Sequence, residues 1–248
     1  MIQGYVKVAV ASPPVSVGDP RKNVDTAVAV VREAESAGAQ VLVFPEMFIT
    51  GYTVGDLLGQ DVLLEAARDS LLELADRTKD TDLCFVTGIP LVAMGRLFDC
   101  AAAVQSGRIL GVVPKMFIPN RREFYERRWF DSGRGLSLTI ELGGEKVPFG
   151  SLLFELGDAL VMGIEICEDL WVPQPPCVSH ALAGATVVVN LSASDEIVGK
   201  SHYRRQMLQS ISARLLCGYL YADAGNGEST TDMVFAGNSM IAENGTLL

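Results

Sequence analysis

Residues 160–171 read Leu-Val-Met-Gly-Ile-Glu-Ile-Cys-Glu-Asp-Leu-Trp, a short apolar run that ends in a cysteine followed by two carboxylates. A run of this length with polar residues at its end is typical of a buried β-strand. Charged side chains are rarely buried without a partner, so the acidic pair after Cys167 indicates that the strand opens into a polar space. A lone cysteine is most often a small core residue, so its neighbours in the fold decide its role.

Two further apolar runs end in the same way. Residues 41–46 read Val-Leu-Val-Phe-Pro-Glu, and residues 109–115 read Ile-Leu-Gly-Val-Val-Pro-Lys. Ligand sites in layered α/β folds lie beyond the carboxyl ends of the strands, so Glu46, Lys115 and Cys167 are predicted to converge there. Taken singly, Glu46 would be interpreted as a strand-end cap and Lys115 as a solvated charge. Together they form a base, an electrophilic stabiliser and a nucleophile.

This combination of side chains points to amide hydrolysis. An amide is a poor electrophile, so its attacker should be a thiolate rather than a thiol. The reference pKa values of Glu and Cys differ by ~4 units, so moving the thiol proton to a glutamate costs roughly 5 to 6 kcal/mol. A nearby ammonium favours the thiolate and lowers this cost, and the three groups should titrate as a coupled set. The sequence therefore predicts a thiol amidohydrolase in which Glu46 serves as base and later as acid.

Strand and helix patterns alternate along the whole chain, which predicts an α/β or layered α+β fold. Asp19-Pro20 is typical of a helix start and Gly38 of a helix stop. The remaining helices are expected at 61–78 and 201–216, and strands at 41–44, 83–87, 160–166, 186–191 and 220–223. Glycine-containing pairs predict hairpin turns at 106–107, 143–144, 157–158 and 244–245. The aperiodic stretch from Pro114 to Gly135 is a candidate active-site loop.

Composition narrows the class of protein. The chain has 248 residues, 49% of them hydrophobic and 20% charged, enough for a sizeable core in one large domain or two small ones. Its formal net charge of -10 argues against a nucleic-acid or anionic-membrane partner, because both reward clustered Lys and Arg. The apolar runs are far shorter than the ~20 residues that cross a bilayer, and the first residues lack the pattern of a secretory signal. No membrane association is predicted.

Cysteine and histidine usage indicates a reducing compartment and no metal site. The five cysteines are an odd count without C-x-x-C spacing, so reduced thiols and a cytoplasmic location are expected. Four of them are interpreted as core residues: Cys84, Cys100, Cys177 and Cys217. Two histidines are too few for a histidine-rich metal centre.

Three segments resemble the nitrilase, or carbon-nitrogen hydrolase, superfamily. They are residues 44–52 (Phe-Pro-Glu-Met-Phe-Ile-Thr-Gly-Tyr), Pro114-Lys115, and residues 163–171 (Gly-Ile-Glu-Ile-Cys-Glu-Asp-Leu-Trp), of which the last is the most specific. Residues 119–128 and 190–194 support the resemblance, which spans 5–247. More narrowly, the segments look like the glutaminase domains of glutamine-dependent NAD synthetases.

The resemblance implies a fold and a set of site residues. The fold would be a four-layer α-β-β-α sandwich, with Glu46, Lys115 and Cys167 as a catalytic triad and Glu126 as an additional orienting carboxylate. The implied glutamine-binding positions are Arg121, Ser194 and Lys200, with Tyr52 and Glu168 lining the pocket.

A basic residue at position 200 could meet the substrate α-carboxylate. Elsewhere the sequence departs from the family pattern in two places. Arg121 stands where the family usually has tyrosine, and residues 195–197 (Asp-Glu-Ile) are more acidic than expected, which could alter pocket selectivity.

The implied activity is hydrolysis of the side-chain amide of L-glutamine through a Cys167 thioester, giving glutamate and ammonia. The ammonia would pass to a C-terminal synthetase domain that makes NAD. No cofactor is expected in residues 1–248, because ATP and Mg²⁺ would serve only that synthetase domain, whose Ser-Gly-Gly-x-Asp-Ser loop does not occur here. The return strand after Asn244-Gly245 stops at Leu248, so the sequence is expected to be cut inside a larger protein. A homo-oligomer is also implied.

Two alternatives stay open at this point. A nitrilase-like amidase or carbamoylase would use the same triad on another small amide, and substrate profiling would separate it from a glutaminase. A catalytically silent domain that docks a synthetase would keep Cys167 only for structure. An unreactive Cys167 with an ordinary thiol pKa would favour that second reading.

Overall fold

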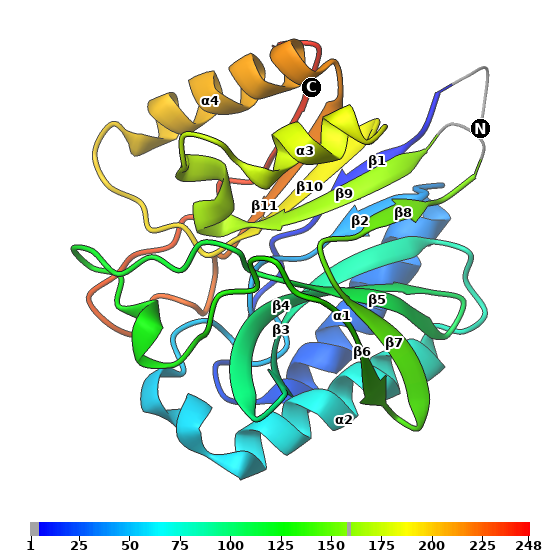
Figure 1. The fold of residues 1–248 in the computed structure, drawn as a ribbon, viewed down its shortest axis with the longest axis vertical. Helices are drawn as coiled ribbons and strands as arrows, with labels where there is room; N and C mark the ends of the chain where they lie inside the picture. The colour runs from blue at the N-terminus through cyan, green and yellow to red at the C-terminus, as the bar shows by residue number, and fades with distance from the viewer. Residues whose placement is uncertain (1–4, 158–159) are drawn as a thin grey trace.

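Two stacked β-sheets with helices on both outer faces make up the molecule (Figure 1). The computed structural model describes residues 5–157 and 160–248. The first sheet has seven strands in the order β1-β2-β3-β4-β5-β7-β6, and the second has six in the order β13-β12-β11-β10-β9-β8. The predicted four-layer α-β-β-α sandwich is therefore confirmed.

The two sheets use consecutive halves of the sequence. The first contains β1 (Val8–Val10), β2 (Val41–Val43), β3 (Cys84–Ala93), β4 (Arg96–Gln105), β5 (Arg108–Pro114), β6 (Ser137–Leu142) and β7 (Glu145–Gly150). The second contains β8 (Leu153–Glu155), β9 (Val161–Ile166), β10 (Val187–Ser192), β11 (Gly218–Asp223), β12 (Met240–Glu243) and β13 (Thr246–Leu247).

Helices cover each sheet on its outer face. α1 (Pro20–Ser36) and α2 (Asp61–Arg77) pack on the first sheet, and α3 (Pro176–Leu182) and α4 (Lys200–Leu215) pack on the second. Single 3₁₀ turns are η1 (Gly55–Gly59), η2 (Glu126–Arg128) and η3 (Cys167–Trp171). In the part of the chain that is described, no helix is long and apolar enough to span a membrane.

Most predicted elements are present, and one helix was missed. The Asp19 side chain accepts a hydrogen bond from the Lys22 backbone N–H at 3.2 Å, as a helix N-cap should. The hairpins at Ser106-Gly107, Gly143-Gly144 and Asn244-Gly245 are confirmed. Helix α3 was not predicted, because the prolines just before it and at its first position hide the helical period. Strand β8 pairs antiparallel with β9, as the hairpin predicted around Gly157-Asp158 requires, although residue 158 itself lies outside the described ranges.

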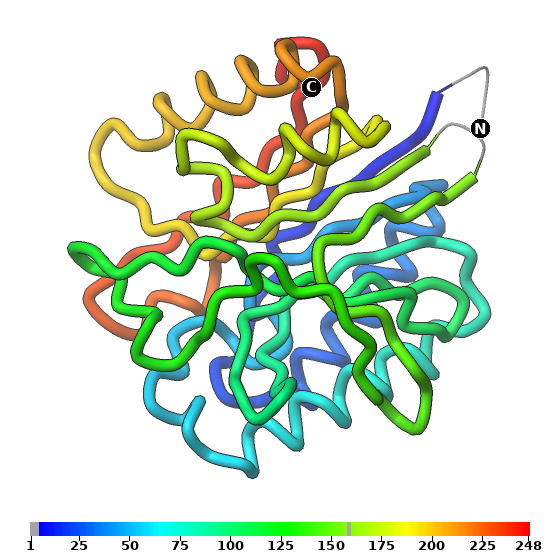
Figure 2. The backbone as a smooth tube through the Cα atoms, in the orientation of Figure 1, coloured from blue at the N-terminus to red at the C-terminus, as the bar shows by residue number. Residues whose placement is uncertain are grey.

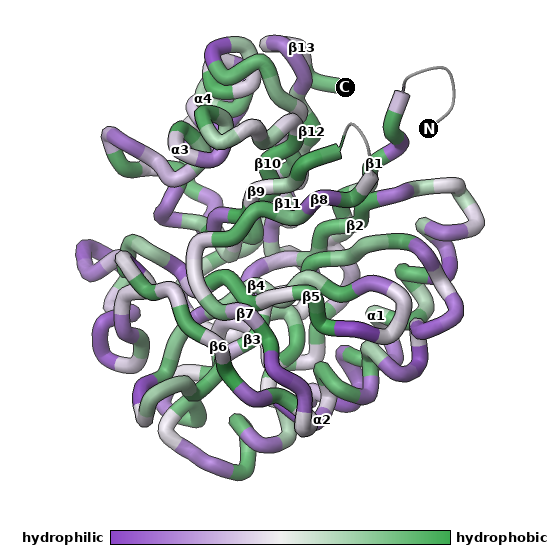
Figure 3. The backbone as a smooth tube through the Cα atoms, turned by 45° about the vertical axis from the view of Figure 1, so that its right-hand side comes forward, coloured by the Kyte–Doolittle hydropathy of each residue, from purple (hydrophilic) through white to green (hydrophobic). Residues whose placement is uncertain are grey.

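Alternation along the strands builds the layers. In β2, Val41 and Val43 face the second sheet, whereas Leu42 and the following Phe44 face α1 and α2. Figure 3 shows the strands mostly in green, the hydrophobic colour, with purple concentrated in loops and on the outer helices. Each fully buried Val, Leu or Phe stabilises the fold by about 1.5–3 kcal/mol. Packing of the core therefore fixes which side chains at the end of each strand point toward which layer.

The strands that matter most for chemistry end on the same side of the sandwich. β1, β2 and β3 run parallel, as do β9, β10 and β11. Figure 2 shows the loops that follow β2 (cyan), β5 (green) and β10 (yellow), together with the red-orange segment after β11, gathered on the left-hand side. The expected active-site loop between Pro114 and Gly135 is among them, with only η2 as regular structure.

Gly88 in β3 lies against the turn that carries Glu46. A Cβ atom at this position would lie 2.1 Å from the Met47 backbone nitrogen and 2.6 Å from the Glu46 carbonyl carbon. Gly88→Ala is expected to lower the free energy of unfolding by about 1–3 kcal/mol, because rigid backbone has to move. Urea unfolding would measure the loss, with Gly59→Ala as the control because a Cβ at Gly59 meets nothing within 4 Å. Equal stability of the two variants would contradict this packing argument.

Candidate active site

The Lys115 ammonium lies at the centre of a buried charge cluster. Lys115 follows β5, and its Nζ donates to Glu46 Oε1 at 2.5 Å and to the two oxygens of Glu126 at 2.9 and 2.7 Å. Asp99 Oδ2 lies 3.3 Å from the same nitrogen. All four residues are buried. Burial alone would lower the pKa of Lys115, but the surrounding carboxylates outweigh it and raise this pKa well above its usual value, so the ammonium stays charged.

Glu46 connects the two sheets. It stands two residues beyond Phe44 on the first sheet, and its Oε2 accepts a hydrogen bond of 2.6 Å from the backbone N–H of Ala193, which follows β10 of the second sheet. Together with the Lys115 contact, both carboxylate oxygens are engaged. The carboxylate is therefore held in one orientation, which is what a general base requires.

Glu126 is the second carboxylate hydrogen-bonded to the ammonium. In addition to its two bonds from Lys115, its Oε1 accepts a hydrogen bond of 2.8 Å from the Tyr52 hydroxyl. Burial raises the pKa of Glu126 to about 7, although Lys115 opposes this change. Glu126 thus fixes the position of Lys115.

Cys167 occupies a sharp elbow directly after β9. Its backbone φ is +43°, a left-handed conformation that non-glycine residues rarely adopt and that is common at functional sites. Asp169 stabilises the elbow, because its carboxylate accepts the backbone N–H of Ile166 at 3.0 Å and that of Phe117 at 2.8 Å. One buried side chain thereby ties the end of β9 to the loop that follows Lys115.

The Cys167 thiol is protonated at rest. Burial, and after it the negative charge of Glu46, raises the pKa of Cys167 well above its usual value, and Lys115 only partly opposes this. The expectation that a nearby ammonium favours the thiolate is correct in direction, but Lys115 does not outweigh burial. A thiolate therefore has to form during the reaction, by proton transfer to a base.

Cys167 is one of the residues that line a pocket of about 490 Å³. Four of the five expected binding residues contribute to its lining: Arg121, Glu168, Ser194 and Lys200. Phe124, Trp171 and Tyr203 form the aromatic part of the wall. Tyr52, expected to line the pocket, is not among the lining residues and instead hydrogen-bonds Glu126. Its phenol turns toward the cluster because a buried hydroxyl needs a partner.

Three of the charged side chains that line the pocket, Arg121, Glu168 and Lys200, take part in ion pairs. Arg121 Nη2 contacts Glu168 Oε1 at 2.7 Å at the exposed mouth. Lys200 pairs with Asp195, and its Nζ lies 5.6 Å from the centroid of the Trp171 ring. Pairing of Lys200 with Asp195 accounts for the acidic segment noted in the sequence. A ligand that carries one positive and one negative group can take the place of one partner in each ion pair.

Arg204 and Asp223 hold the Ser194 segment in place, and neither was predicted. Asp223 Oδ1 accepts the backbone N–H of Ser194 at 2.9 Å, and Arg204 lies 3.4 Å from Asp223 and 3.3 Å from the Ser194 hydroxyl. Arg204 is fully buried on α4. The only signal in the sequence for Asp223 was its position at the end of a strand, and nothing distinguished Arg204 from the other polar residues of its helix.

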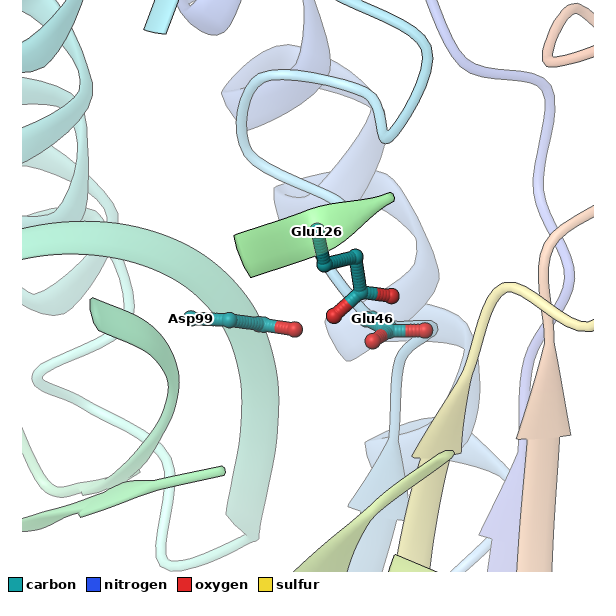
Figure 4. A group of neighbouring side chains, drawn as sticks. All are labelled: Glu46, Asp99 and Glu126. Atoms are coloured by element: carbon teal, nitrogen blue, oxygen red, sulfur yellow. The ribbon is translucent and has the colours of Figure 1, made fainter. Parts of the chain in front are cut away.

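Asp99 is the third residue that sequence reasoning missed. Figure 4 shows its carboxyl group pointing from β4 toward those of Glu46 and Glu126. One oxygen from each of the three lies within 4.8 Å of the others, a spacing that could hold a metal ion. The Lys115 ammonium already lies among these carboxylates, so they have a cation of their own. A single aspartate inside the apolar run 97–101 was the available signal.

Lys115, taken singly, was interpreted as a solvated charge, and this is wrong. Its side chain is fully buried because the three carboxylates provide the partners that a buried ammonium needs. The predicted convergence of Glu46 and Lys115 is confirmed, and Cys167 faces the pocket beside them. The four cysteines interpreted as core residues are all free and buried.

Comparison with known proteins adds an independent line of argument. Residues 7–246 match the sequence model of the carbon-nitrogen hydrolase family. The chain is 45% identical over 248 residues to the glutamine-dependent NAD(+) synthetase of Mycobacterium tuberculosis, covering 99% of this chain and 36% of that protein. The glutamine-dependent NAD(+) synthetase of Thermotoga maritima is 32% identical over 229 residues, which are 92% of this chain and 36% of that protein. The chain thus spans about a third of the length of these curated relatives.

Solved structures share the fold. The glutamine-dependent NAD(+) synthetase of Cytophaga hutchinsonii superposes with a TM-score of 0.88 at 32% identity, over 98% of this chain and 40% of that one. An amidase from Nesterenkonia superposes with a TM-score of 0.76 at 21% identity, over 100% of this chain and 86% of that one. At that identity, the amidase supports the sandwich fold alone.

Proposed function

Because the chain belongs to the carbon-nitrogen hydrolase family, we propose that it hydrolyses the side-chain amide of L-glutamine to glutamate and ammonia, with Cys167 as the nucleophile. One observation carries this proposal. Cys167 lines a pocket and interacts electrostatically with Glu46 and Lys115, and the pocket wall presents both cations and carboxylates. A glutamine amide at Cys167 would leave its α-ammonium and α-carboxylate among those charges.

Acylation would begin with transfer of the Cys167 proton to Glu46. The sulfur attacks the amide carbon, and Lys115 with the backbone N–H after Cys167 would stabilise the oxyanion. The C–N bond then breaks as Glu46 returns the proton to the leaving nitrogen, so ammonia departs and a thioester remains. Proton transfer inside the cluster leaves its total charge unchanged, which suits a buried site.

Deacylation would again use Glu46, first as a base toward water and then as an acid toward the sulfur. Water takes the place of ammonia, Glu46 accepts one of its protons, and the oxygen attacks the thioester carbon. The C–S bond breaks, the sulfur recovers the proton from Glu46, and glutamate leaves. Neither half-reaction needs a metal or an organic cofactor, in keeping with our proposal that this domain uses none.

Lys200 is proposed to bind the α-carboxylate of the substrate. Lys200→Met is expected to raise KM for glutamine about 10- to 100-fold with a smaller change in kcat, because a hydrogen bond to a charged group contributes roughly 1.5–3 kcal/mol. Steady-state kinetics would measure this, and Lys200→Arg should retain most of the affinity. Butyramide has no α-carboxylate, so its hydrolysis should be unaffected. Equal losses for glutamine and butyramide would contradict the assignment.

The fate of the ammonia is a further part of the proposal. The names of the relatives suggest that it feeds ATP-dependent synthesis of NAD by a synthetase domain, with ATP and Mg²⁺ used there. A cytoplasmic location fits the five free thiols. Self-association, proposed from the resemblance, would be tested by light scattering coupled to size-exclusion chromatography.

The decisive experiment is intact-protein mass spectrometry after exposure to a glutamine-mimicking diazoketone. It needs only one attack by the nucleophile. We expect a single adduct that is absent in Cys167→Ala and suppressed by glutamine but not by asparagine. An adduct suppressed instead by another small amide would favour the amidase or carbamoylase alternative. Folded protein without any adduct would favour a silent docking domain.

A further inference from the structure

Asp99 is a buried carboxyl group that the proposed mechanism does not use. It lies in the middle of β4, is completely buried, and is 3.3 Å from Lys115 Nζ. Neither of its carboxyl oxygens has a hydrogen-bond partner among the described residues. Its backbone carbonyl accepts the N–H of Lys115 at 2.8 Å, so the two residues are also joined through the β4–β5 ladder.

The three carboxyl groups around Lys115 differ in the support that they receive. Glu46 accepts hydrogen bonds from Lys115 and from the Ala193 backbone, and Glu126 accepts them from Lys115 and the Tyr52 hydroxyl. Asp99 accepts none from the part of the chain that is described. Asp99 has the Lys115 ammonium nearby but no hydrogen-bond donor, whereas each glutamate has a second donor, so the ionised form of Asp99 is the least supported of the three.

Counting charges leads to the same residue. Three ionised carboxylates around one ammonium would leave a net charge of two negative units in a sealed space, whereas one bound proton halves it. The titratable groups that face Asp99 from neighbouring elements and from its own strand are Glu46, Lys115, Glu126 and Cys100. Burial, and after it the charge of Glu46, raises the pKa of Asp99 well above its usual range.

We propose that Asp99 is held as a neutral carboxylic acid beside Lys115. It acts as a positioning residue, because its neutral state limits the negative charge around Glu46 when Glu46 accepts the thiol proton. With Asp99 neutral, the resting cluster carries one net negative charge, and the ammonium is shared between two carboxylates instead of three. Ionisation of Asp99 would place a second uncompensated negative charge beside Glu46, which opposes formation of the thiolate. This role rests on the proposed amidohydrolase function, but the proton itself can be detected without turnover.

The first test is the pH dependence of stability in Asp99→Asn, which has the same shape but no titration. Folded wild-type protein would retain a proton that the unfolded chain releases above about pH 4, so wild-type stability falls with pH relative to the variant. The ratio of the variant's folding equilibrium constant to that of the wild type should therefore increase roughly tenfold for each pH unit between about pH 5 and 7. Asp69→Asn, at an exposed position on α2, is the control for losing one aspartate. A ratio independent of pH would overturn the proposal.

The second test locates the proton within the cluster. Carbon-13 in the side-chain carboxyl of aspartate gives an NMR signal whose shift distinguishes acid from carboxylate, and the glutamates stay unlabelled. The Asp99 signal is identified by its absence in Asp99→Asn. A shift typical of a protonated acid at neutral pH supports the proposal. A carboxylate shift would overturn it.

The third test connects the proton to catalysis. The alkaline limb of the pH profile of kcat/KM should move upward by roughly one to two pH units in Asp99→Asn, because the ionisation that opposes thiolate formation is removed. A purely structural role would change the height of the profile and leave its limbs in place, which would overturn the proposal. If the chain has no glutaminase activity at all, the stability and NMR measurements still decide the state of Asp99. Failure of the proposed function is thereby separated from failure of this inference.

Discussion

Cys167→Ala is expected to lower glutamine hydrolysis by at least about four orders of magnitude, because Cys167 is the only cysteine among the described residues that line the pocket. Alanine removes the sulfur but leaves the pocket, Glu46 and Lys115 in place, so the folded state should persist. A coupled assay for glutamate, run on wild type and variant at equal folded concentration, measures the effect.

A matched control comes from another buried cysteine. Cys217 packs at the end of α4, in the cluster that also holds Leu208 and Tyr219, away from the pocket. Cys217→Ala should cost some stability and keep most of the activity. If Cys167→Ala retained more than about one hundredth of the wild-type rate, Cys167 would not be the nucleophile.

Lys115→Met is expected to abolish activity and to lower the free energy of unfolding by about 3–5 kcal/mol, because it leaves buried carboxylates without their cation. The substitution keeps the length of the side chain and removes only the charge. Without the ammonium, the pKa values of the carboxylates rise in the folded state. Such groups stabilise the fold below their unfolded pKa and lose that contribution as pH increases, so the deficit should shrink toward acid pH.

Urea unfolding at two pH values would measure this change. Lys79→Met is the control, because Lys79 makes only an exposed ion pair with Asp76 at 2.9 Å. Exposed pairs contribute about 0–1 kcal/mol, so this variant should resemble the wild type. A Lys115→Met deficit no larger than that of Lys79→Met would show that the buried cluster does not need its cation.

The sequence predicted the elements whose patterns are local. Asp19-Pro20 and the apolar spacing behind it define α1 without help from the rest of the chain, and Asn244-Gly245 does the same for the last hairpin. Strand β3 was predicted at about half its length, because its second part is buried by long-range pairing with β4. Helix α3 begins after closely spaced prolines, so tertiary packing and not propensity decides it.

The candidate site was predictable to the extent that strand ends identify it. Glu46, Lys115 and Cys167 follow strands, and parallel strands of one layer end on one side. The contacts of Asp99 and Arg204 depend on which elements pack over them, information that local sequence does not contain. The position of Tyr52 was missed for a related reason. Its place in the resembling segment suggested the pocket, and only the fold brings Glu126 within reach of its hydroxyl.

The division of the two sheets between consecutive halves of the chain has a consequence for biosynthesis. Glu46, Asp99, Lys115 and Glu126 all belong to the half that leaves the ribosome first, whereas Cys167 and the Ala193 amide belong to the half that follows. Domains generally fold as units, and residues of both sheets share one core cluster, so the site can be complete only after the second half has been synthesised. A nascent chain that lacks the second half therefore lacks both the thiol and one anchor of Glu46. The proposed hydrolysis would then report that both sheets have packed together.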